Sequence, residues 1–370
     1  MHVAVIAHNR HAVAEPFMGG MEAHTHLLCR ELRAAGHAVT LLAAGESDDA
    51  CLAPICPAPY EAELPWDIYR GTRQLEDFQR RAYAAAFEIV RAGRFDVVHN
   101  NSLFPALIDW ARRDGIPMVT TQHVPPFARM AEAVRRAEND DAARITFVSE
   151  SQVPLWFAQK PSNASVVYNG IDCRIWHPGE KHSGRLVWTG RITPNKGLLE
   201  AVEAVRRAGA ALDIAGQAED REYLAACMAA TGDADIRFLG QLHGEELRAL
   251  VRRSKAALVT PMWDEPFGLV AAEALASGVP VIAFDRGAMR EVVGPCGVVV
   301  EAGSVDALTQ AIMRADGFDR AACRERAVSR FSAEAMVAAY ESVYRAAMGA
   351  AATGAAASAS SCSRTAALLA

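Results

Sequence analysis

The first half of the chain alternates short, continuously apolar runs with longer amphipathic ones. Parallel strands that are covered on both faces are apolar throughout, so the short runs are predicted as buried strands. Alternation of strands with helices predicts a doubly wound α/β sheet. The predicted strands are Val3–Ala7, Ala38–Leu42, Asp96–His99, Met118–Thr121 and Ile145–Val148, and the predicted helices are Gly20–Ala35, Leu75–Ala92, Phe104–Asp114 and Phe127–Asn139.

A polar segment rich in glycine and proline, residues 166–185, interrupts this alternation and is predicted as an interdomain linker. The alternation then restarts, which predicts a second α/β domain. Residues 331–348 form one more amphipathic helix, and the Ala/Ser-rich residues 349–370 are predicted to be disordered because they have little to pack. The elements predicted after the linker are Leu186–Gly190, Leu198–Ala208, Leu212–Ala215, Glu219–Ala230, Ile236–Leu239, Gly244–Arg253, Ala256–Pro261, Leu269–Ala276, Val279–Ala283 and Gly297–Val300.

Composition narrows the class of protein. With 370 residues, 51% hydrophobic and 22% charged, the chain is typical of a soluble protein with two domains. A net charge of −6 argues against a general nucleic-acid surface, which needs a basic excess. The eight cysteines include no C-x-x-C motif. The N-terminal apolar run predicts a strand rather than a signal peptide. No apolar run reaches the length of about 20 residues that a helix needs to span a bilayer. We therefore expect a cytoplasmic protein.

Glycine-rich turns after predicted strands are the first candidate sites. Gly19 and Gly20 open the first long helix, where free backbone amides and partial positive charge favour a phosphate. A turn that merely uses glycine explains this pair equally well. The fingerprint G-x-G-x-x-G is absent from the chain, which argues against a nicotinamide or flavin enzyme.

The segment "WTGRITPNKG" offers two cations in the loop between a predicted strand and a predicted helix. Arg191 and Lys196 are five residues apart, and both precede the helix that starts near Gly197. In open α/β sheets, ligands bind at the carboxyl ends of the strands. We therefore expect the two side chains to converge on one anion.

The segment "EPFGLVAAE" places Glu265 before a helix and Glu273 within it. The amides of Phe267, Gly268 and Leu269 at the helix start have no intrahelical partner, which favours an anion. Carboxylates accept hydrogen bonds from sugar hydroxyls. Two carboxylates on either side of a phosphate site fit a nucleotide sugar, with Glu273 on the ribose and Glu265 on the donated hexose.

These motifs, together with "FLGQL", "VVYNGID…WHP" and the early Gly-Gly loop, resemble retaining glycosyltransferases of family 4 in order and to about residue 348. The resemblance implies a GT-B fold: two Rossmann-like domains facing across a cleft, with a C-terminal helix crossing back to the first. It implies an acceptor domain at 1–168, a donor domain at 169–330, a crossover helix at 331–348 and a tail at 349–370.

The resemblance also implies roles for individual residues. Arg191 and Lys196 correspond to the diphosphate clamp, Glu273 to the ribose ligand and Leu242 to the contact with the base. Glu265, with the amides of Phe267, Gly268 and Leu269, corresponds to the donor-sugar site. In "VTTQHVPPF", His123 corresponds to a histidine that faces the donor sugar and its phosphate, whereas a lone histidine is otherwise usually structural. His99 in "DVVHNNS" is a weaker candidate, for acceptor or structure.

The implied reaction proceeds with retention, and the leaving diphosphate helps to deprotonate the acceptor. The catalytic contribution of His123, Glu265, Arg191 and Lys196 is then positioning and charge neutralisation, and we expect no cofactor and no metal. The D-x-D motif at Asp233–Asp235 is interpreted as a solvated loop before a strand.

Other interpretations stay open at this point. A nucleotide-sugar epimerase of the same architecture is one, and a non-catalytic nucleotide-sugar-binding subunit is another. UDP is the commonest donor nucleotide in the family, while GDP and ADP also occur. The acceptor is not identified by the sequence; its site is expected in loops near 43–75 and 122–132, with no basic amphipathic run to indicate a lipid.

Overall fold

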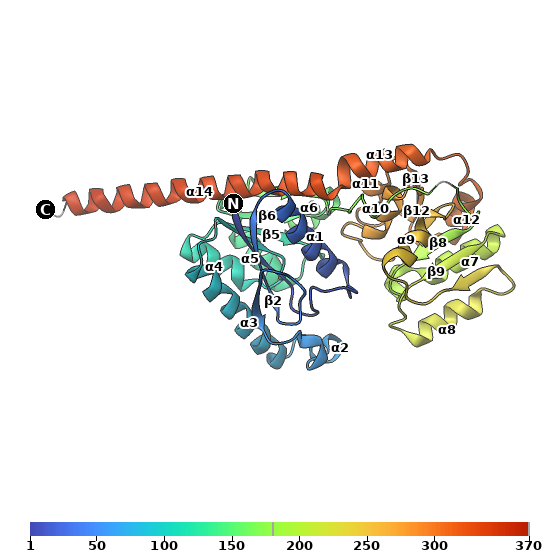
Figure 1. The fold of residues 1–370 in the computed structure, drawn as a ribbon, viewed down its shortest axis with the longest axis horizontal. Helices are drawn as coiled ribbons and strands as arrows, with labels where there is room; N and C mark the ends of the chain where they lie inside the picture. Colours follow the sequence, from blue (N-terminus) through green and yellow to red (C-terminus); the bar gives the residue numbers. More distant parts are fainter. Residues whose placement is uncertain (180, 369–370) are drawn as a thin grey trace. The chain divides into compact units, whose positions relative to one another are not determined.

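The computed structural model describes residues 1–179 and 181–368, with side chains described through Thr353. The chain divides into two compact units (Figure 1). Unit 1 comprises Met1–Val148, Val153–Val167 and the C-terminal stretch from Met336, and unit 2 comprises Ser149–Gln152 and Tyr168–Ala335. Each unit is built on one parallel sheet, which confirms the predicted α/β class.

The sheet of unit 1 has seven parallel strands in the order β3-β2-β1-β4-β5-β6-β7. The hydrophobic pattern did not predict the two edge strands. One contains Pro54, which an edge tolerates because one side of the strand needs no ladder hydrogen bonds; the other has only three residues. The strands are β1 (His2–Ile6), β2 (Ala38–Ala44), β3 (Leu52–Cys56), β4 (Val97–Asn100), β5 (Met118–Gln122), β6 (Ala143–Phe147) and β7 (Ala164–Val166).

Helices cover both faces of this sheet. The buried side chains Leu28 and Leu32 of α1 share one apolar cluster with Tyr340 and Tyr344 of the C-terminal helix α14. A second apolar cluster contains Tyr83 of α3 together with α4 residues. The helices are α1 (Gly20–Ala34), α2 (Trp66–Tyr69), α3 (Arg73–Ala92), α4 (Ala106–Asp114), α5 (Ala128–Arg136), α6 (Val153–Trp156) and α14 (Ala333–Leu368).

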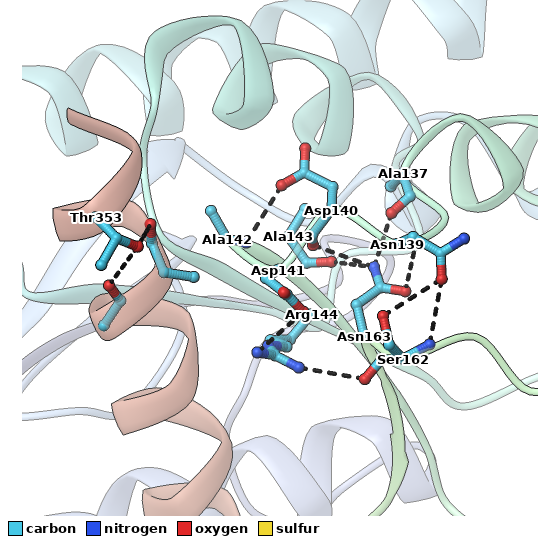
Figure 2. A network of polar contacts seen from close by, with 12 residues as sticks. Ala137, Asn139, Asp140, Asp141, Ala142, Ala143, Arg144, Ser162, Asn163 and Thr353 are labelled. Carbon is cyan, nitrogen blue, oxygen red and sulfur yellow. Dashed lines mark hydrogen bonds and ion pairs between the residues drawn. The ribbon is translucent and has the colours of Figure 1, made fainter. Parts of the chain in front are cut away.

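Figure 2 shows how a buried amide holds the turn between α5 and β6. Asn163 donates from Nδ2 to the carbonyl oxygens of Ala137 and Ala143, each at 2.7 Å, and its Oδ1 accepts from the backbone of Asn139 at 3.0 Å. Asn139 has φ of +61°, a conformation that asparagine adopts more readily than most residues. The side chain therefore satisfies turn groups that no helix or strand would otherwise bond.

The sheet of unit 2 has six parallel strands in the order β10-β9-β8-β11-β12-β13. Helices α7 and α12 pack together, and so do α10 and α13. The strands are β8 (Leu186–Thr189), β9 (Leu212–Ala215), β10 (Ile236–Phe238), β11 (Ala257–Val259), β12 (Val281–Phe284) and β13 (Gly297–Val300). The helices are α7 (Leu198–Ala208), α8 (Arg221–Ala230), α9 (Gly244–Arg252), α10 (Leu269–Ala276), α11 (Met289–Val293), α12 (Val305–Met313) and α13 (Arg320–Phe331).

Helix α14 starts at Ala333 in unit 2 and continues within unit 1 from Met336. The sequence predicts this helix over 331–348 and disorder over 349–370. In the structure the helical backbone instead continues through Leu368, which agrees with the high helix propensity of alanine; the last two residues lie outside the described part. No helix in the described part of the chain is long and apolar enough to cross a membrane.

The strand order of each sheet changes direction at one point, between β1 and β4 in unit 1 and between β8 and β11 in unit 2. Connections from these strands leave toward opposite sides of the sheet, so a crevice forms beyond their carboxyl ends. The predicted Lys196 and Glu265 follow β8 and β11, and the Gly19–Gly20 pair follows β1. The topology therefore directs the search for a site to these ends.

Candidate donor and histidine sites

Lys196 and Glu265 meet at the point where the order of the unit 2 sheet reverses. Lys196 Nζ lies 2.6 Å from Glu265 Oε2, and the same oxygen accepts from Trp263 Nε1 at 2.9 Å. Lys196 Nζ also lies 5.2 Å from the centre of the Trp263 ring. The side chains of Lys196 and Glu265 are 23% and 14% exposed, so a ligand could reach both.

Close backbone packing brings the two loops together. Gly197 has φ of +65°, and a Cβ there would lie 2.0 Å from the carbonyl oxygen of Thr260. Thr260 Oγ1 donates to the Gly197 carbonyl at 2.8 Å, and the Met262 amide donates to Asn195 at 2.9 Å. Glycine is therefore required at position 197, because any side chain would separate the loop that carries Lys196 from the loop that carries Glu265.

Glu265 lies in the loop that leads into α10, three residues before its cap Gly268. Gly268 caps this helix with φ of +87°, and a Cβ there would lie 2.1 Å from Met289 Cε. The first intrahelical bonds run from Ala271 and Ala272 to the Gly268 carbonyl, so the amides of Gly268 and Leu269 precede them. The Phe267 side chain is 2% exposed and contacts Tyr168 and Phe331, so only its backbone could serve a ligand.

Glu273 lies one turn further along α10 and makes no side-chain hydrogen bond or ion pair among the described residues. Its neighbours Ala271, Ala272 and Ala274 are fully or almost fully buried, while Glu273 itself is partly exposed. Burial raises the pKa of the Glu273 carboxyl from 4.5 to about 7. A carboxyl that lacks partners inside the protein yet is open on one side is suited to accept hydrogen bonds from a ligand.

The two predicted cations of the clamp bind different carboxylates. Arg191 NH1 lies 3.2 Å from both carboxylate oxygens of Glu219, a residue that follows β9, and both side chains are exposed. Lys196 instead pairs with Glu265. Exposed ion pairs are weak, so an anion could displace the Arg191 partner at low cost. The structure thus places both residues after β8 without showing the predicted convergence.

A cavity of about 290 Å³ lies at the ends of β9 and β10, and Ile192, the residue after Arg191, lines it. Gly240 and Gln241 line it, whereas Leu242, which was predicted to contact a base, is the next residue along and half-buried. The apolar lining residues are Ile192, Ile214, Ala218, Leu224, Met228 and Phe238. Among the described residues, no group of three or more His, Cys, Asp or Glu side chains could hold a metal ion.

In unit 1, Gly19 caps α1 and Gly20 begins it, so the Gly-Gly pair opens the helix. A Cβ on Gly19 would lie 2.9 Å from Glu22 Oε2. The first turn of α1 therefore already carries a buried carboxylate close to its amino end. A phosphate at Gly19 and Gly20 would have to compete with this negative charge.

His123 follows β5 and is partly exposed, and its Nε2 lies 2.9 Å from Asn101 Oδ1. Its ring packs edge-on against His24, with centroids 4.6 Å apart. Burial and the neighbouring His24 and His99 hold the pKa of His123 well below its usual value, so the ring is neutral at pH 7. His99 is fully buried and hydrogen-bonded to Tyr344, which makes it structural rather than a direct acceptor ligand.

Sequence reasoning missed three polar residues that contact the predicted site residues: Trp263, Glu219 and Asn101. Trp263 lies two residues before Glu265, and its indole N–H was the available signal. Glu219 and Asn101 had none, because their partners Arg191 and His123 are 28 and 22 residues away. Only the sheet order brings such positions together.

Comparison with known proteins agrees with this architecture. Residues 18–174 match the family model "Glycosyltransferase Family 4", and residues 183–315 match "Glycosyl transferases group 1". The glycogen synthase of Mycobacterium tuberculosis is 29% identical, covering 89% of this chain and 92% of that protein. An MMP alpha-(1->4)-mannosyltransferase of Mycolicibacterium hassiacum is 28% identical, covering 70% and 72%.

Solved structures show the same fold. AviGT4, a glycosyltransferase involved in avilamycin A biosynthesis, has a TM-score of 0.70 at 22% identity and covers 94% of this chain and 98% of its own. Anabaena HepE in complex with UDP and glucose has a TM-score of 0.67 at 16% identity and covers 92% and 98%. From two Rossmann-like domains, both family models and named glycosyltransferase relatives, we conclude that the chain is a glycosyltransferase of the GT-B fold.

Proposed function

We propose that the enzyme is a retaining family 4 glycosyltransferase that transfers a hexose from a UDP-linked sugar to an acceptor hydroxyl in the cytoplasm, without a metal. One observation carries the donor assignment. A cation and a carboxylate, Lys196 and Glu265, pair between the loops that lead into α7 and α10, and Glu273, which has no side-chain partner among the described residues, lies one turn into α10. The charge of Lys196 and the free amides of the helix start match a diphosphate, and the two carboxylates match the hexose and the ribose on either side of it.

In this proposal each group acts on one part of the donor. Lys196 and Arg191 neutralise the leaving diphosphate, helped by the amides of Gly268 and Leu269 at the helix start. Glu265 accepts hydrogen bonds from the hexose, and Glu273 accepts them from the ribose. Bound diphosphate would draw Lys196 away from Glu265, which frees that carboxylate for the sugar at the same time.

Two observations support UDP as the nucleotide of the donor. The HepE structure of the same fold contains UDP and glucose. In unit 2, the apolar cavity beside Gly240 and Gln241 offers backbone groups next to a surface on which a base could pack. His123 is assigned to the donor sugar through the family resemblance, and its neutral ring suits contact with hydroxyls rather than binding of phosphate by charge.

A thermal-shift panel of UDP-, GDP-, ADP- and dTDP-linked glucose tests the donor. A ligand that binds only the native protein raises the melting temperature in proportion to the logarithm of its concentration over Kd. We expect the UDP-sugar to give the largest rise, and release of UDP from it to distinguish an enzyme from a binding subunit. A rise with GDP-glucose alone would contradict the assignment of the nucleotide.

The raised pKa of Glu273 predicts a pH-dependent contribution to UDP binding. The carboxyl is protonated below about pH 7 and ionised above it, and only the ionised form accepts hydrogen bonds from both ribose hydroxyls. The advantage of the native enzyme over Glu273→Gln should therefore shrink by roughly 10-fold between pH 8 and pH 6. Calorimetry of both proteins with UDP measures this ratio, in which titration of UDP itself cancels. A ratio that is constant with pH would remove Glu273 from the ribose site.

A further inference from the structure

A single amide oxygen joins two histidines in unit 1. Asn101 Oδ1 lies 2.9 Å from His123 Nε2 and 3.0 Å from His99 Nε2. Because a carboxamide oxygen only accepts hydrogen bonds, each of these nitrogens must carry its proton. Asn101 is fully buried, and its Nδ2 donates to Thr25 Oγ1 at 3.4 Å, which keeps the oxygen turned toward the histidines.

The far side of His99 contacts the C-terminal helix. His99 is fully buried and its pKa is lowered to about 3, so the ring is neutral. With Nε2 protonated, its Nδ1 is an acceptor, and Tyr344 O–H donates to it at 2.6 Å. Thr121 Oγ1 lies 2.9 Å from His99 Nε2 and further restrains the ring. Tyr344 belongs to α14, 245 residues from His99.

This chain of hydrogen bonds determines which ring nitrogen of His123 carries the proton. With Nε2–H donating to Asn101, the lone pair of this neutral imidazole is on Nδ1. The His24 ring packs against His123 at 4.6 Å and limits its rotation. His24 is 3% exposed, and neither of its nitrogens has a hydrogen-bond partner in the described part of the chain, so it contributes packing and no competing hydrogen bond.

We infer that Asn101 is a positioning residue which, held by Tyr344 through His99, fixes the tautomer of the partly exposed His123 so that its unprotonated nitrogen is Nδ1. This Nδ1 would accept a hydrogen bond from a hydroxyl of the donor sugar, a step that rests on the proposed role of His123. Helix α14 thereby acts on a candidate catalytic side chain as well as on the apolar core. The arrangement excludes a role of neutral His123 as a donor through Nδ1.

Nitrogen-15 spectra of the histidine rings test this inference without any ligand. The full-length protein is labelled at its 11 histidines, and His123→Gln and His99→Gln assign two of the signals. We expect both rings in the wild type to be neutral with Nε2 protonated. Asn101→Ala should convert His123 to a mixture of tautomers, and Tyr344→Phe should weaken the Nε2–H preference of His99 while preserving the fold. Tyr83→Phe, which removes another buried hydroxyl of unit 1, should leave both signals unchanged.

The possible outcomes separate this inference from the proposed function. A His123 signal that is unchanged in Asn101→Ala, or already mixed in the wild type, would overturn the positioning role. Turnover of UDP-glucose is then measured for His123→Ala and Asn101→Ala, and we expect kcat to fall by about 10- to 100-fold in the second with little change in KM. If His123→Ala turned over normally while Asn101→Ala still showed the tautomer shift of His123, the catalytic role of His123 would be refuted. The hydrogen-bond chain from Tyr344 to His123 would remain supported.

Discussion

Replacing Glu265 by alanine should lower kcat by roughly 100-fold or more while UDP binds as tightly as before, or more tightly. The reason is that Glu265 is proposed to contact the hexose, the part of the donor whose charge changes in the reaction, and UDP has no hexose. The structure adds a second reason. Glu265 holds Lys196 at 2.6 Å, so its removal frees that cation for the diphosphate.

Steady-state turnover of the donor and calorimetry with UDP measure the two parts of this prediction. Glu219→Ala is the matched control, because it removes an exposed carboxylate that pairs with Arg191 and should leave kcat nearly unchanged. In Glu265→Gln the side-chain oxygen can still accept a hydrogen bond from Trp263 Nε1. This variant therefore distinguishes the effect of losing the charge from the effect of losing the side chain. If Glu265→Ala lost UDP affinity as severely as Glu273→Ala, both glutamates would only stabilise the structure around α10, and their proposed roles would be wrong.

Lys196→Ala should weaken UDP binding by roughly 10- to 100-fold, which corresponds to the loss of one charge-assisted hydrogen bond. The diphosphate would lose a cation, and the Glu265 carboxylate would keep its hydrogen bond from Trp263 Nε1. Calorimetry with UDP measures the effect. Lys255→Ala, which removes a lysine paired with Asp316 elsewhere in unit 2, should bind UDP normally.

The double variant Lys196→Ala/Glu265→Ala shows whether the two residues are coupled, because the free-energy effects of substitutions at residues in direct contact are not additive. In the single Lys196→Ala variant, the remaining carboxylate repels the diphosphate. The double variant should therefore recover part of the lost UDP affinity. Equal UDP affinity in the wild type and Lys196→Ala would show that Lys196 does not bind the diphosphate.

Much of the fold was predictable because the strands and helices have local signatures. Core strands such as β1 and β5 are short apolar runs, and α10 starts where Gly268 was expected to open it. The elements that were missed have weaker signals. Strand β3 contains a proline and lies at an edge, and α13 shows mostly charged and small side chains whose packing against α10 no periodicity reveals.

For the candidate site, too, features that are local in the sequence were predictable and features that depend on packing were not. The sequence alone determines that Glu265, Gly268 and Glu273 share one helix and its entry, because their spacing is local to the chain. It also determines which residue types could meet a nucleotide sugar. It could not show that burial raises the pKa of Glu273, since that depends on side chains packed around α10.

Only the tertiary structure decided which distant residues meet. Lys196 and Glu265 are 69 residues apart, and they form a pair because β8 and β11 are neighbours where the sheet order reverses. His99 and Tyr344 are 245 residues apart, and they bond because α14 packs on the sheet of unit 1. Hydrophobic periodicity specifies which face of an element is buried, but the pairing of strands and the docking of helices arise from burying all those faces at once.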